Sequence, residues 1–118
     1  MATKPAGKER RRNSRARINR PGRIRVQGGP ESHTQLIDIS TEGAAFYYAS
    51  PLERGTDVVV TFHLNMNPET VWVTLQGRVA LSHVKGNSNL VRIVFIRPAE
   101  EDVLTIREFI KHKMQQRE

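Results

Sequence analysis

Apolar residues recur at every second position through much of the chain between Ile24 and Phe95, and this alternation most constrains the fold. A period of two places successive side chains on opposite faces of an extended strand. The clearest run is Val58, Val60, Phe62 and Leu64. The pattern predicts strands that bury one face each, as in an antiparallel sheet or barrel.

Turn-forming residues divide the alternating region into short segments. The breaks fall at Gly28-Gly29-Pro30, Thr41-Glu42-Gly43, 51–55, 65–68 and Gly86-Asn87. Glycine, proline and asparagine favour turns because they adopt or impose the required backbone angles. We therefore expect a first strand that begins at Ile24, followed by strands near 35–40, 44–48, 58–64, 71–81 and 91–95. Gly77 predicts a bulge or bend in the fifth strand.

The period changes near the C-terminus, where Val103, Ile106 and Ile110 fall on one helical stripe. Pro98 suits the first turn of a helix. Acidic residues 100–102 and basic residues 111–113 complement the two ends of the helix dipole. Six short strands followed by one helix predict a mostly β protein: a small six-stranded antiparallel barrel with a C-terminal α-helix packed on or beside it.

Positive charge is concentrated at the start of the chain. Residues 1–25 hold ten lysines or arginines against Glu9 alone, which gives +9 and leaves −2 for the rest of a chain whose net charge is +7. We divide the chain into a flexible basic arm, residues 1–20, and a barrel domain, residues 21–118. A cationic arm indicates an anionic partner such as a nucleotide, a nucleic acid or an acidic surface.

Several classes of protein lack support in this sequence. With no cysteine there is no disulfide framework and no thiolate metal site. The four histidines share no metal-ligand spacing, and no nucleophile or acid–base pair stands out. We therefore expect no enzyme, no metal and no cofactor. The chain also lacks an apolar leader or membrane-spanning run, so we expect a cytoplasmic protein without membrane insertion.

The segment Asp38-Ile39-Ser40-Thr41-Glu42-Gly43 is a candidate binding motif. Asp38 and Ser40 lie two positions apart, so both side chains should leave the outer face while Ile37 and Ile39 point toward the core. A carboxylate accepts hydrogen bonds from two N–H groups at once, and the Watson–Crick edge of guanine offers such a pair. Gly43 would allow a positive φ and close approach to the backbone. Alternatively, these residues only fix a turn.

Arg11 and Arg15 form a second candidate motif, four positions apart in the basic arm. A guanidinium group bonds guanine at O6 and N7, grips phosphate, or stacks on a purine face. A ligand with two guanines and two phosphates would use all three modes. The alternative is a basic run that binds nothing in particular.

Together, Arg11-x-x-x-Arg15 and Asp38-x-Ser40-x-x-Gly43 resemble the PilZ family of cyclic di-GMP receptors, and the resemblance covers roughly residues 9 to 112. It implies a six-stranded barrel whose arginine arm clamps the nucleotide against the outer face. By this resemblance Arg11 and Arg15 contact guanine and phosphate. It also implies that Asp38 and Ser40 contact a guanine edge or nearby donors, and that Gly43 permits close backbone approach.

The lead-in to the arginine motif bears on stoichiometry. An arginine at the place of Arg10 accompanies two stacked nucleotides in the PilZ family, so the resemblance implies an intercalated pair of cyclic di-GMP molecules. The competing interpretation makes Arg10 a solvated member of a basic run. The sequence departs from the family at Leu81, where many members carry tryptophan, and a missing stacking partner would lower affinity.

The resemblance implies a second-messenger receptor in a bacterium: binding orders the arginine arm and alters contact with an unidentified downstream protein. Motility, exopolysaccharide synthesis and pilus control are not separated by the sequence. Two alternatives stay open. One is a small β-barrel that binds nucleic acid, the less favoured partner, and the other is an adaptor that binds no nucleotide.

Overall fold

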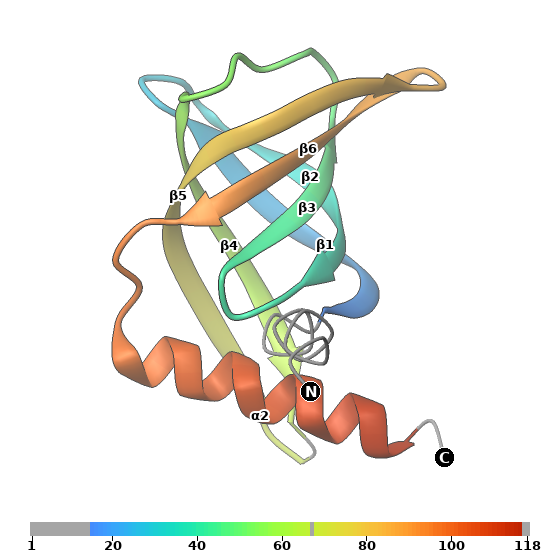
Figure 1. The fold of residues 1–118 in the computed structure, drawn as a ribbon, viewed down its shortest axis with the longest axis vertical. Helices are drawn as coiled ribbons and strands as arrows, with labels where there is room; N and C mark the ends of the chain where they lie inside the picture. The colour runs from blue at the N-terminus through green and yellow to red at the C-terminus, as the bar shows by residue number, and fades with distance from the viewer. Residues whose placement is uncertain (1–14, 67, 117–118) are drawn as a thin grey trace, which may run out of the picture.

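The computed structural model describes residues 15–66 and 68–116. The elements in chain order are β1 (Ala16–Val26), β2 (Glu31–Ile39), β3 (Gly43–Tyr48), β4 (Asp57–Asn65), β5 (Thr70–Lys85), β6 (Ser88–Phe95) and α2 (Glu100–Gln116). The strands close into a barrel in the order β1-β2-β3-β6-β5-β4, and every neighbouring pair is antiparallel (Figure 1). The predicted six-stranded barrel with a C-terminal helix is confirmed.

The alternating apolar residues fill the interior of the barrel. On β4 every second residue is buried, and β6 buries Val91, Ile93 and Phe95 in the same way. The helix α2 lies across one end of the barrel (Figure 1), where Ile106, Phe109 and Ile110 join the same core. These side chains close that end of the core. Burying a large apolar side chain fully stabilises the fold by about 1.5–3 kcal/mol relative to leaving it exposed, so the helix also adds stability.

The first strand begins at Ala16, eight residues before the predicted start at Ile24. Ala16, Arg17 and Arg20, which the charge pattern assigns to the arm, therefore pair with β2. The early start of β1 is hard to predict because proline, here Pro21, usually indicates a break in a strand. In the barrel it pairs with β2 at Gln35, whereas pairing with β4 begins only at Gly22, so its missing N–H interrupts no β4 bond.

A bulge in β2 changes which side chains enter the core. The register between β2 and β3 shifts between Leu36 and Asp38. Because an extra residue resets the alternation, Leu36 and Ile39 are both buried while Ile37 is only half-buried. The prediction that Ile37 points into the core is wrong. Asp38 remains on the outer surface.

The fifth strand also contains a bulge, but at a different place from the predicted one. Gly77 keeps the regular register, and the shift falls between Val79 and Leu81. A Cβ on Gly77 would lie 2.8 Å from Cδ1 of Ile93. Glycine at this position therefore makes room for a core side chain rather than for a bend.

Candidate functional site

Asp38 lies at the centre of a row of residues that crosses several strands on the outside of the barrel. Its register partners are Arg17 on β1 and Ala45 on β3. Ala45 lies opposite Arg92 on β6, and Arg92 lies opposite Leu81 on β5. Because side chains that are directly opposed share a face of the sheet, Asp38 and Arg92 flank Ala45 on its two sides.

Asp38 and Arg92 form an ion pair across Ala45. Arg92 Nη1 lies 3.7 Å from Asp38 Oδ1, and the two side chains are 33% and 16% exposed, respectively. Both side chains of the Arg78–Asp57 pair, in contrast, are about half exposed. Ala45 is fully buried yet lies outside the core cluster, which fits a methyl group covered from outside by the two charged side chains.

The geometry of this pair leaves Asp38 able to accept further hydrogen bonds. A separation of 3.7 Å is longer than a hydrogen bond, and the Asp38 carboxylate accepts no hydrogen bond from the described residues. A carboxylate offers about four lone-pair sites. Partial burial lowers the local dielectric, so a ligand donor placed here would interact more strongly than it would in water.

Ser40 fixes the tight turn between β2 and β3. Its hydroxyl oxygen accepts hydrogen bonds from the backbone N–H groups of Glu42 and Gly43, at 3.1 and 3.2 Å. The Ser40 N–H donates to the Gly43 carbonyl at 2.9 Å. Ser40 is buried. Ser40 therefore stabilises the turn, as the alternative interpretation of this motif predicts for its residues.

Gly43 is required by strand packing. Its φ lies outside the left-handed region, so the positive φ that glycine would allow is not adopted here. A Cβ at this position would overlap the carbonyl oxygen of Ile93 on β6. The missing side chain lets β3 approach β6, which brings Asp38 and Arg92 within reach of each other.

A pocket of about 140 Å³ lies on one side of the Asp38–Arg92 pair. Its lining includes the four described residues that the sequence predicts to bind the ligand, namely Arg15, Asp38, Ser40 and Gly43. Ala80, the extra residue at the β5 bulge, also lines it. Residues that are far apart in the sequence thus meet in one place.

A second pocket of about 450 Å³ lies on the other side of the pair. It shares Asp38 and Arg92 with the first pocket and adds the cationic side chains Arg17 and Lys85 together with Tyr47. We call the two pockets the Asp38 site. The cations of the site exceed its carboxylates, so its field favours an anionic ligand.

The two remaining predicted site residues, Arg10 and Arg11, lie outside the described residues. Three cationic residues of the site were not predicted from the sequence, namely Arg17, Lys85 and Arg92. Arg92 was detectable in part, because it alternates with the buried Val91 and Ile93 and so must point outward. Its position beside Asp38 depends on the pairing of β3 with β6, which are not consecutive strands.

Leu81, where the family resemblance would favour tryptophan, is 47% exposed and lies opposite Arg92. It therefore borders the site from β5 as an aliphatic surface. An aliphatic side chain offers contact area without an aromatic face for stacking.

Two features are absent from the part of the chain that the structure describes. Within residues 15–66 and 68–116, no group of three histidine, aspartate or glutamate side chains is placed to hold a metal ion. In the same ranges, no helix combines the length and the apolar character that crossing a membrane requires.

Solved structures with the same fold include three of direct interest. The Bacillus subtilis inhibitor of motility MotI/DgrA matches with a TM-score of 0.71 and 14% identity, over 90% of this chain and 51% of that chain. The K. pneumonia MrkH–c-di-GMP complex matches with 0.71 and 18%, over 90% and 53%. The PilZ domain of YcgR from Escherichia coli with c-di-GMP matches with 0.66 and 14%, over 92% and 94%.

These similarities establish the fold, and the chain spans about half the length of MotI/DgrA and MrkH. No curated protein matches the chain. The sequence pattern of the PilZ domain, however, matches residues 9–112 of the 118. That match covers the arginine motif, the whole barrel and most of α2. The chain therefore belongs to the PilZ domain family.

Proposed function

We propose that this chain is a receptor for cyclic di-GMP, rather than an enzyme, and that the nucleotide binds at the Asp38 site. The observation that carries the proposal is the half-buried Asp38 carboxylate, which keeps free acceptor sites among cationic side chains. Membership of the PilZ family supports it. So do the MrkH and YcgR structures with the same fold, which are complexes with c-di-GMP.

The proposed chemistry divides the ligand between the charged groups. Asp38 accepts hydrogen bonds from the two N–H groups on the Watson–Crick edge of one guanine. Arg15, and Arg11 from the preceding segment, bond guanine or phosphate oxygens. Arg92 and Arg17 add positive charge beside the phosphates. Ser40 and Gly43 act mainly by holding the turn and the β3–β6 spacing that place Asp38.

The proposal includes a change in the basic arm. Arg10, Arg11, Arg12 and Arg15 repel one another without a ligand, and a dianion removes that repulsion. Binding therefore orders this segment over the barrel and alters the surface that a downstream protein meets.

We further propose that two stacked cyclic di-GMP molecules bind together. Two pockets adjoin at Asp38 and Arg92, so there is room on both sides of the pair. Two dinucleotides bring four phosphates close together, and the four clustered arginines offset their repulsion. Arg10 is the residue on which this stoichiometry depends.

The test is calorimetric titration of the chain with cyclic di-GMP, with cyclic di-AMP as the control ligand. Both ligands carry the same phosphates, but adenine lacks the paired N–H groups of guanine that a carboxylate binds. We expect about two bound cyclic di-GMP molecules per chain and much weaker binding of cyclic di-AMP. In Arg10→Leu the stoichiometry should fall toward one. Equal affinity for both ligands would contradict the role of Asp38, and one ligand per chain would contradict only the stacked pair.

A further inference from the structure

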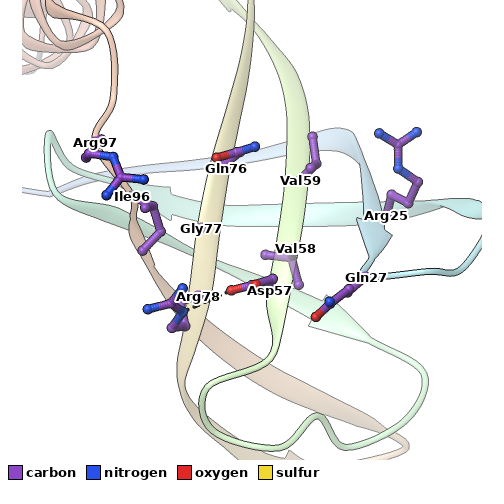
Figure 2. A pocket seen from close by; sticks show the side chains of 10 residues that line it. All are labelled: Arg25, Gln27, Asp57, Val58, Val59, Gln76, Gly77, Arg78, Ile96 and Arg97. Carbon is purple, nitrogen blue, oxygen red and sulfur yellow. Dashed lines mark hydrogen bonds and ion pairs between the residues drawn. The ribbon is translucent and has the colours of Figure 1, made fainter.

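A separate groove of about 330 Å³ crosses the outer surface of β1, β4 and β5. Figure 2 shows Arg25 and Arg97 at its two ends, with Gln76 and Val59 between them. Arg25 comes from β1, and Arg97 from the segment that joins β6 to α2. We call this surface the Arg25–Arg97 groove. It shares no lining residue with either pocket of the Asp38 site.

The two arginines at the ends of the groove are not neutralised by the described part of the chain. Asp57, the carboxylate of the groove, is already paired with Arg78, whose Nε lies 2.9 Å from its Oδ1. The side chains of Arg25 and Arg97 make no ion pair or hydrogen bond with a described residue. Both side chains are exposed. The groove therefore presents two separated positive charges to a ligand.

The backbone at Arg97 adds an independent observation. Its φ is 42°, in the left-handed region that favours glycine or asparagine. An arginine in this conformation is strained, and such strain is concentrated at functional sites. Glycine would satisfy the turn without strain, but it would remove the guanidinium group from the end of the groove.

The lining of the groove indicates the class of ligand. It contains no aromatic ring on which a nucleotide base could stack. It does contain the side-chain amides of Gln27 and Gln76, which both donate and accept hydrogen bonds, and the half-buried apolar side chain of Ile96. These groups suit a peptide backbone and one apolar side chain, while the arginines at the ends suit carboxylates.

We propose that the Arg25–Arg97 groove binds an acidic peptide segment of a partner protein. Carboxylates on the segment pair with Arg25 and Arg97, and its backbone crosses Gln76. This inference does not rest on nucleotide binding, because the two sites have separate linings.

The test is a backbone NMR titration with the capped peptide Glu-Glu-Ile-Glu-Glu, in the presence and absence of cyclic di-GMP. We expect shifts of the Gln76, Gly77 and Ile96 amides that saturate, and far smaller shifts with Gln-Gln-Ile-Gln-Gln. Because the basic arm also attracts acidic peptides, only shifts within the groove count. No such shifts at a peptide concentration of about 1 mM, where even weak binding is visible, would overturn the proposal.

Matched double variants separate the groove from the overall charge. Arg25→Gln/Arg97→Gln should lower peptide affinity by about tenfold or more, since two charge-assisted contacts are lost. Arg107→Gln/Lys111→Gln removes the same charge from exposed positions on α2 and should change affinity less than about twofold. Equal losses in the two double variants would show that binding is nonspecific and would refute the groove.

Arg97→Gly distinguishes a binding role from a structural one. Since glycine adopts the left-handed conformation freely, the melting temperature should rise or stay unchanged while peptide affinity falls. A clear loss of thermal stability with unchanged peptide affinity would assign Arg97 to the turn and contradict the proposal.

Discussion

A single methyl group, that of Ala45, lies between the two charged side chains at the centre of the Asp38 site. Asp38 and Arg92 can meet because the residue between them on β3 is small. Ala45→Leu should push the charged side chains apart and lower cyclic di-GMP affinity by about tenfold, because the added atoms enter space that these side chains cover. Calorimetric titration checks this, with Ala49→Leu as the control at an exposed position just after β3. Unchanged affinity in Ala45→Leu would show that the ion pair is not part of the binding surface.

The charged residues themselves should each contribute to binding. Arg15→Ala and Asp38→Ala each remove a charge-assisted contact, so we expect affinity to fall about tenfold or more, roughly 1.4 kcal/mol. Arg107→Ala, on the exposed surface of α2, is the matched control for Arg15. Both site variants should keep the spectrum of a folded protein. Wild-type affinity in either one would contradict the proposed contacts.

Gly43 should contribute to the stability of the fold. In Gly43→Ala the new Cβ would overlap the Ile93 carbonyl oxygen, so β3 and β6 must separate at a cost of about 1–3 kcal/mol. The control is Gly29→Ala, whose Cβ would lie 3.3 Å from its nearest neighbour, the Val26 carbonyl oxygen. Thermal or denaturant unfolding compares the two. A larger loss at Gly29 than at Gly43 would contradict the packing role.

At the scale of elements, ligand binding should change backbone order most in the segment that carries Arg10 and Arg11. It leads directly into β1, whose Arg17 lies opposite Asp38. We expect the backbone order parameters of residues 10–14 to rise when cyclic di-GMP binds, because the ligand neutralises a run of like charges. NMR relaxation with and without ligand measures this change, and the amides of β4 serve as an internal reference. Equal order in the two states would refute the ordering.

The strands differ in how well the alternation of apolar residues predicts them. Alternation identifies β4 and β6 because each buries every second residue without interruption. It fails at Ile37 because a bulge inserts one residue without a compositional signal. It also misses the start of β1, where Pro21 lies inside a strand.

The same limit applies to the site. The motif Asp38-x-Ser40-x-x-Gly43 could be found from the sequence because its residues are local. Arg92 and Lys85 reach the site only through the pairing of β3 with β6 and through the β5–β6 hairpin. Local spacing carries no information on which distant strands are neighbours, so these cations appear only in the folded barrel.

For the whole molecule, closure of the barrel limits the surfaces that a ligand could use. Among the described residues each strand pairs with two neighbours, so no strand is an edge along its whole length. We therefore expect recognition to use side chains on the outer surface. The Asp38 site centres on β2, β3 and β6 with additions from β1 and β5, whereas the Arg25–Arg97 groove crosses β1, β4 and β5, and the two share no lining residue. If both proposals hold, one small domain offers separate surfaces to a nucleotide and to a protein.

The most direct test of the account is a backbone NMR map of cyclic di-GMP binding to the complete chain. We predict saturable shifts of the amides of Asp38, Gly43 and Arg92, with the Arg25–Arg97 groove largely unaffected. Absence of shifts at saturating ligand, or shifts confined to β1, β4 and β5 away from Asp38, would contradict the central claim that the Asp38 site binds cyclic di-GMP.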